Sequence, residues 1–188
     1  MLCCHFVSRK SLSQIKKCGF LKPNTPLVSI SDLTVNIKVL REKYGMNREK
    51  CNEIRNFARR FPIGKFICVI PKHRIRSWIS SGLMEEINHF IKPQYVLEFE
   101  VPKNSKLFAR EHIYQSPREI KKKFPTKMYR NTPEPYKTLA WLKYFMSTRK
   151  VKDNLDLRKI KVPELWIQSK IPVSKITITQ NNTPTDPR

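Results

Sequence analysis

Glu164 is the one carboxylate in the stretch VPELWIQSKIPVSKITI, residues 162–178, whose other side chains are apolar, cationic or neutral polar. A carboxylate at the head of a buried strand can stabilise positive charge that develops in a transition state. It can also be a simple counter-charge on an edge strand, paired with nearby lysines. The two interpretations differ in what they predict. A catalytic Glu164 should face a cleft, whereas a counter-charge should face bulk solvent beside lysines.

Two earlier segments carry further candidate side chains. HFVSRKSLSQIKKCGFLKP, residues 5–23, places His5 on a predicted strand, followed by a helix that Ser8 or Ser11 caps and Gly19 ends. PLVSIS, residues 26–31, is a short strand or loop that contains Ser29 and Ser31, and Ser31 is also a good N-cap for the next helix. A late strand, VLEFEVP, comes between these segments and Glu164.

The serial order of these segments resembles the ADP-ribosyltransferase-like fold, which includes nucleic-acid-targeting toxins and, more distantly, the tRNA 2′-phosphotransferases. The resemblance spans most of the chain and implies NAD as cofactor. It implies that His5 contacts the adenosine side of NAD, that Ser29 and Ser31 line the nicotinamide pocket, and that Glu164 is catalytic. Breaking the nicotinamide–ribose bond creates an oxocarbenium-like state, which a carboxylate bonded to the 2′-hydroxyl stabilises. The alternative for His5 is a structural role, as a partly buried histidine whose ring is hydrogen-bonded within the protein.

The resemblance does not identify which aromatic residue stacks on nicotinamide. The four candidates are Tyr44, Phe61, Tyr95 and Tyr114. The segment 105–149 is longer than a minimal fold of this family needs, so it is a candidate substrate-binding insertion. Within it, Arg110 and His112 could act in the site, with Arg110 on the NAD pyrophosphate. The alternative for Arg110 is an exposed ion pair with Glu111 or Glu119.

The charge of the chain points to a polyanionic partner. The sequence has 38 Lys and Arg against 15 Asp and Glu, a formal net charge of +23, which exceeds what solubility requires. We therefore expect DNA or RNA as a partner. Two groups of residues are candidates for phosphate contacts: Arg48, Arg55 and Arg59 on a predicted helix, and Lys72, Arg74 and Arg76 in PKHRIR. The alternatives are a solvated helix face and, for the whole chain, a non-catalytic basic protein of a ribosome or nucleoprotein.

The sequence disfavours several other classes of protein. GxGxxG and GKS/T loops are absent, which excludes Rossmann and P-loop nucleotide sites. Five cysteines without a CxxC pair predict reduced thiols in a cytoplasmic protein, with neither a disulfide framework nor a metal site. No apolar run is long enough to span a membrane. A nuclease would need paired acids at a metal, for which Glu98 and Glu100 are the nearest candidates.

Periodicity predicts a mixed α+β domain with a split β-sheet core and flanking helices. We expect strands over 3–7, 65–71, 95–102 and in the two halves of 163–180, with a strand or loop over 107–114. We expect helices over 47–60, over 74–91 with a break at Gly82, over 116–124 and over 133–150. The predicted organisation is a single domain over 1–178 and a disordered tail over 179–188.

Overall fold

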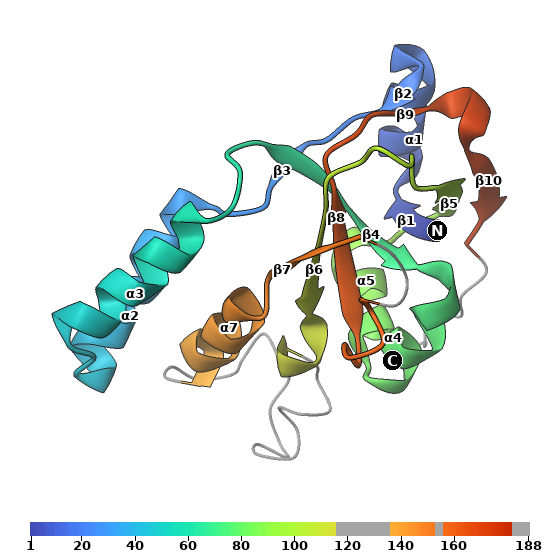
Figure 1. The fold of residues 1–188 in the computed structure, drawn as a ribbon. Helices are drawn as coiled ribbons and strands as arrows, with labels where there is room; N and C mark the ends of the chain where they lie inside the picture. Colours follow the sequence, from blue (N-terminus) through green and yellow to red (C-terminus); the bar gives the residue numbers. More distant parts are fainter. Residues whose placement is uncertain (116–135, 153–155, 182–188) are drawn as a thin grey trace.

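The computed structural model describes residues 1–115, 136–152 and 156–181, and its centre is a large antiparallel sheet with flanking helices (Figure 1). The main path of the sheet is β10–β5–β1–β4–β8–β6–β7, and β3 pairs with β4 beside it. β2 and β9 form a separate two-stranded sheet. The strands are β1 (Leu2–Val7), β2 (Phe20–Leu21), β3 (Thr25–Pro26), β4 (Lys65–Pro71), β5 (Tyr95–Glu100), β6 (Leu107–Glu111), β7 (Arg149–Val151), β8 (Pro163–Ile167), β9 (Ile171–Pro172) and β10 (Thr177–Gln180). The predicted mixed α+β class is confirmed.

The helices begin and end largely where local sequence signals predict. The Ser8 hydroxyl accepts a hydrogen bond from the backbone N–H of Ser11 at the start of α1, and Gly19 ends this helix with φ 73°. Gly82, with φ 80°, separates α4 from α5 as expected. The helices are α1 (Arg9–Cys18), α2 (Ile30–Tyr44), α3 (Arg48–Arg59), α4 (Ile75–Ser80), α5 (Leu83–Ile91) and α7 (Tyr136–Met146), with 3-10 turns η1 (Lys72–Arg74), η2 (His112–Gln115) and η4 (Val173–Lys175).

The predicted boundaries fail at the C-terminal end of α7 and in the tail. The helix expected to run to residue 150 ends at Met146, because the chain turns there and Arg149–Val151 pairs with β6 as β7. β10 ends at Gln180, as predicted for the second strand within 163–180, but it overlaps the first two residues of the tail predicted to be disordered. The helix predicted over 116–124 and residues 182–188 lie outside the described residues.

Segment 105–149 contributes to the centre of the fold and is not simply an insertion. Its strand β6 pairs with β8 on one side and with β7 on the other. Four of the five β6 residues are buried, so the sheet would lose a core strand without this segment. The sequence predicted a strand or loop over 107–114, but the pairing of this strand with β8 and β7 leaves no local signal.

Both faces of the sheet are covered by apolar packing. Cys3 belongs to a core cluster that includes Leu12 of α1, whereas its neighbour Cys4 packs with Trp78 of α4 and Leu83 of α5. This arrangement follows from the strand geometry, since consecutive side chains point to opposite faces. Residues on β1 therefore present alternate side chains to two different environments.

The pair α2–α3 forms a third packed unit, on the side of the sheet away from α4 and α5 (Figure 1). Its core contains Ile37 and Leu40 from α2, Ile54 from α3 and Phe145 from α7. Ser29 is the N-cap of α2, with its hydroxyl 3.2 Å from the backbone nitrogen of Asp32. The N-cap is therefore two residues earlier than the Ser31 that the sequence suggested.

The strands β1 and β4 pair over only two residues and then separate. Their register is Cys3 with Pro71 and Cys4 with Ile70. Further along β4, Phe66 pairs instead with Thr25 of β3. The sheet is thus split between β1 and β4 beyond Cys4, and this split positions the site described below.

Candidate functional site

A cleft of about 410 Å³ opens at the split between β1 and β4. Its walls come from β1, the segment around β3, β4, the pair α4–α5, η2 and β8. We call this hollow the main cleft. Both His5 of β1 and Glu164 of β8 line it. Its volume falls within the usual range for small-molecule sites, and its apolar wall with a few polar groups is typical of them.

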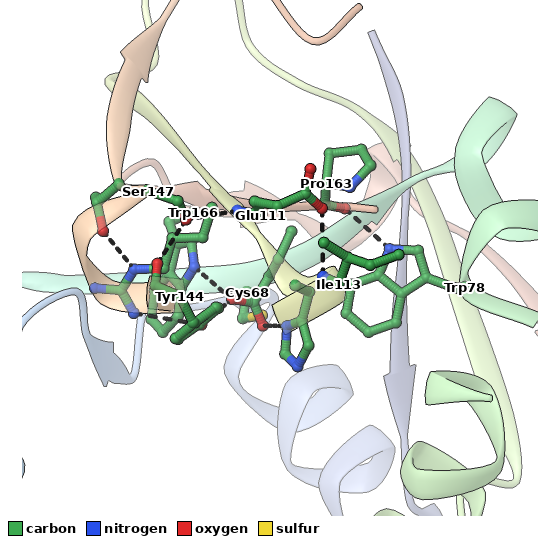
Figure 2. A network of polar contacts seen from close by, with 12 residues as sticks. Cys68, Trp78, Glu111, Ile113, Tyr144, Ser147, Pro163 and Trp166 are labelled. Carbon is green, nitrogen blue, oxygen red and sulfur yellow. Dashed lines mark hydrogen bonds and ion pairs between the residues drawn. The ribbon is translucent and has the colours of Figure 1, made fainter. Parts of the chain in front are cut away.

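Glu164 is a buried carboxylate on a central strand, with 6% of its surface exposed. Its Oε1 accepts a hydrogen bond from the Cys68 thiol at 3.0 Å. Its Oε2 accepts one from the Trp166 indole at 2.9 Å and another from the Tyr144 hydroxyl. Cys68, Tyr144 and Trp166 lie close together in Figure 2. The interpretation as a solvent-facing counter-charge beside lysines is therefore wrong, because β4 and β6 flank β8 on both sides.

The surroundings of Glu164 keep it ionised. Burial alone would raise the pKa of this carboxyl, but the charge of His112 and the hydrogen bonds from His112, Cys68 and Tyr144 outweigh burial and lower the pKa to about 2. His112 Nδ1 lies 3.5 Å from Glu164 Oε1. The His112 ring is also held between two aromatic rings, with centroids 4.9 Å from Trp78 and 5.0 Å from Tyr144.

Neighbouring side chains surround both oxygens of the Glu164 carboxylate. An ionised carboxylate offers about four lone-pair positions. Cys68, Tyr144 and Trp166 donate the three hydrogen bonds described above. His112 lies beside Oε1 as the fourth neighbour, so the influence of Glu164 on a ligand in the main cleft, which it lines, comes from its negative charge.

The backbone carbonyl of Cys68 on β4 holds the His5 ring in one tautomer. Its Nδ1 lies 2.8 Å from the carbonyl oxygen of Cys68, and a carbonyl only accepts, so Nδ1 carries the proton. Burial lowers the pKa of His5, which keeps the ring neutral. Nε2 is then an acceptor in a side chain that lines the main cleft.

Arg110 lies behind the site and does not line the main cleft. It is 5% exposed and donates hydrogen bonds to Thr148 Oγ1 at 2.8 Å, to the Tyr144 hydroxyl at 3.3 Å and to the carbonyl of Leu27. Its guanidinium also lies over the Tyr144 and Trp166 rings, 4.9 Å from each centroid. These contacts support neither the predicted pyrophosphate contact nor the predicted exposed ion pair. Arg110 is instead a positioning residue that reaches Glu164 through Tyr144.

The two serines predicted to line the nicotinamide pocket lie at the start of α2. Ser29 and Ser31 are 2.9 Å apart, oxygen to oxygen, and neither lines the main cleft. Ser29 acts as the helix cap, which is the alternative that local sequence also allowed. The polar residues of this part of the chain that do line the cleft are Asn24 and Thr25.

The aromatic wall of the main cleft comes from residues that the sequence did not indicate. Phe6 and Trp78 line it, whereas Tyr44, Phe61 and Tyr95 do not. The Trp78 indole is fixed by a hydrogen bond of 3.0 Å to the carbonyl of Pro163, visible in Figure 2. The side chain of Tyr114 lies outside what the structure describes.

Glu111 stabilises the loop that precedes β8. Its carboxylate accepts hydrogen bonds from three backbone N–H groups, those of Lys161 at 2.7 Å, Val162 at 2.9 Å and Ile113 at 3.3 Å. Figure 2 shows the bond from Ile113. It therefore holds η2 against the start of β8. This contact places His112 beside Glu164.

Sequence reasoning could have found one of the missed residues around Glu164. Trp166 lies two residues further along the same strand, so strand periodicity places it on the same face. Cys68 and Tyr144 carry no such signal, because β4 and α7 reach Glu164 only through tertiary packing.

The six predicted phosphate-binding residues fall into different environments. Arg48 and Arg55 line a second hollow between α2 and α3, and the Arg59 guanidinium donates to Asn56 at 3.2 Å outside that hollow. Lys72 is 2.5 Å from Glu98, and Arg74 donates to the backbone carbonyls of Leu157 and Ile160. Arg76 is exposed on α4. Lys72 and Arg74 are thus already engaged within the chain.

The described residues contain neither a candidate metal site nor a membrane-spanning helix. Over residues 1–115, 136–152 and 156–181, no group of three or more His, Cys, Asp or Glu side chains could hold a metal ion. Glu98, proposed above as half of a nuclease metal site, is paired with Lys72. None of the helices in the described part of the chain has the length and apolar character needed to cross a membrane.

No family model matches the chain, and neither the curated proteins nor the solved structures include a match. The main cleft offers an ionised carboxylate, a neutral imidazole acceptor and an aromatic wall. Such a site suits a ligand with sugar hydroxyls and a flat ring, and it can stabilise positive charge that develops near Glu164.

Proposed function

We propose that the chain is an NAD-dependent ADP-ribosyltransferase, of the ADP-ribosyltransferase-like fold class, that acts on a nucleic acid or a nucleic-acid-associated target. One observation carries the proposal: His5 and Glu164, from opposite ends of the chain, line the same cleft. The split between β1 and β4 that forms this cleft suits the split sheet of that fold class.

NAD supplies the ADP-ribosyl group when bound: its C1′–nicotinamide bond breaks with the electron pair on nicotinamide, and a nucleophilic acceptor atom bonds to C1′ and releases its proton to water. Glu164 stabilises the positive charge of the oxocarbenium-like state, since its lowered pKa keeps it ionised at neutral pH.

The other residues of the main cleft bind and orient. His5 Nε2 accepts from a ribose hydroxyl, because Nδ1 is occupied by the Cys68 carbonyl. Trp78 and Phe6 provide apolar surface for a flat ring. The net charge of +23 attracts the acceptor, which we propose is DNA or RNA, or a protein bound to it.

The test is nicotinamide release by the purified full chain incubated with NAD, alone and with single-stranded DNA, duplex DNA or RNA. We expect release in the presence of at least one nucleic acid. Glu164→Gln keeps the size of the side chain but removes its charge, and we expect it to reduce release at least about a hundredfold. No release from the wild type with any nucleic acid would end the proposal.

The matched control is Glu100→Gln, which removes an exposed carboxylate at the end of β5. We expect it to leave nicotinamide release unchanged. Thermal unfolding of each variant separates a loss of activity from a loss of folding. Activity that survives in a folded Glu164→Gln variant would remove Glu164 from the mechanism.

A second candidate function is that of a non-catalytic, basic nucleic-acid-binding protein. The observation that favours it is the arginine-lined hollow between α2 and α3, which is separate from the main cleft. In that case Glu164 serves only to join β4, β8 and α7 through Cys68 and Tyr144. Nucleic-acid binding without nicotinamide release would favour this second function.

A further inference from the structure

Three arginines from two helices line one hollow on the α2–α3 pair. Arg41 of α2 and Arg48 and Arg55 of α3 border a hollow of about 370 Å³, with Asn52 between them. The same three arginines border an adjoining hollow of about 530 Å³, which Lys38 also lines. Because both hollows share these side chains, we treat them as one surface, the arginine groove.

The helix geometry explains why these side chains meet. Arg48 and Arg55 are seven residues apart, two turns of helix, and so lie on the same face of α3. Arg41 lies in the last turn of α2 and comes beside them because the two helices pack through Ile37, Leu40 and Ile54. The sequence pattern alone grouped Arg59 with Arg48 and Arg55, but Arg59 lines neither hollow.

The positive charge of the arginine groove is not neutralised by described carboxylates. Among the described residues, no ion pair involves Arg41, Arg48 or Arg55. Glu42 lines the second hollow, and it lies 3.9 Å from Lys38. The only described hydrogen bond from these guanidinium groups joins Arg55 to Asn52, at 3.1 Å. Three neighbouring guanidinium groups therefore repel one another unless an anion lies between them.

The shape and charge of the groove favour an extended polyanion. Guanidinium groups pair with phosphate oxygens through two parallel hydrogen bonds, and Asn side chains also contact phosphates. A single compact phosphate would fill only a small part of two adjoining hollows. The charge of +23 over the whole chain adds long-range attraction for a polymer of phosphates.

We infer that the arginine groove binds the phosphodiester backbone of a nucleic acid, through Arg41, Arg48 and Arg55. The groove belongs to the α2–α3 pair, away from α4 and α5, which help to wall the main cleft (Figure 1). It therefore holds the nucleic acid at a distance from Glu164 and acts independently of the reaction proposed above. Its test needs no NAD, so the inference and the proposed function can fail separately.

The experiment measures fluorescence anisotropy of labelled single-stranded and duplex oligonucleotides across a salt series, with the full chain. We expect the double variant Arg48→Gln/Arg55→Gln to bind about tenfold or more weakly near physiological salt. The dependence of log affinity on log salt should also flatten by roughly 1.4 to 1.8, since each of the two lost phosphate contacts removes about 0.7–0.9. All three arginines are exposed, so these variants should keep the wild-type melting temperature.

Two controls separate a site from a general charge effect. Lys16→Gln/Lys17→Gln removes the same charge from the last turn of α1, and we expect at most about a twofold loss. Arg41→Gln should weaken binding severalfold, whereas Arg59→Gln, on the same helix pair but outside the groove, should not. Equal losses in the groove and control variants would overturn the inference. So would binding to anionic phosphatidylserine vesicles without binding to either oligonucleotide.

Discussion

Arg110 and Glu164 lie opposite each other on the paired strands β6 and β8, and the hydroxyl of Tyr144 joins their charges. This hydroxyl accepts a hydrogen bond from Arg110 Nη1 at 3.3 Å and donates one to Glu164 Oε2. Burial, and then the negative charge of Glu164, raise the pKa of Tyr144 well above its usual value, so the phenol stays a neutral donor. The buried cation and anion are thus joined by one shared polar atom.

Tyr144→Phe tests this connection with a minimal change in shape. The variant removes one hydrogen bond from Arg110 and one from Glu164 while both charges stay buried. We expect the free energy of unfolding at pH 7 to fall by about 1–3 kcal/mol, measured by urea denaturation. Tyr95→Phe is the control, because the Tyr95 hydroxyl makes no described hydrogen bond. Equal effects from the two variants would mean that Tyr144 only fills space.

Acid titration tests the ionised state of Glu164. Its pKa is lowered from 4.5 to about 2 in the folded protein, so ionisation stabilises the fold above pH 4.5. That stabilisation, about 3 kcal/mol from the size of the shift, should be lost as pH falls from 4.5 towards 2. Urea unfolding of wild type and Glu164→Gln across pH 6 to 2.5 measures it. The difference in stability should shrink towards the acid end, and a constant difference would contradict the lowered pKa.

Two substitutions at His5 separate its structural bond from its role in binding. The amide nitrogen of His5→Asn can still donate to the Cys68 carbonyl, whereas His5→Ala leaves that carbonyl without its partner. We expect the free energy of unfolding to stay near wild type in His5→Asn and to fall by about 1–3 kcal/mol in His5→Ala. Both variants should lose nicotinamide release, since both lack Nε2. Full activity in His5→Asn would assign His5 a purely structural role.

Much of the secondary structure could be predicted because its signals are local. Ser8 and Gly19 delimit α1, and Gly82 separates α4 from α5, through contacts within three or four residues. A continuous apolar run bounded by Gly64 and Pro71 predicted β4, and the alternation of apolar residues predicted β5. The prediction that Ser29 and Ser31 line the nicotinamide pocket was wrong for a local reason. Serine is typical both of a strand that lines a pocket and of a helix N-cap, and Ser29 is the N-cap of α2.

By itself, the sequence determined most of the longer strands and helices, the net charge of +23 and the presence of Glu164 near the head of a strand. Only the tertiary structure decided that β1 separates from β4, that His5 and Glu164 line one cleft, and that Tyr144 joins Glu164 to Arg110. It also decided that Arg41, and not Arg59, lies beside Arg48 and Arg55. The physical reason is range: helix caps and side-chain alternation act between near neighbours, whereas strand register and buried polar networks join segments far apart in the chain.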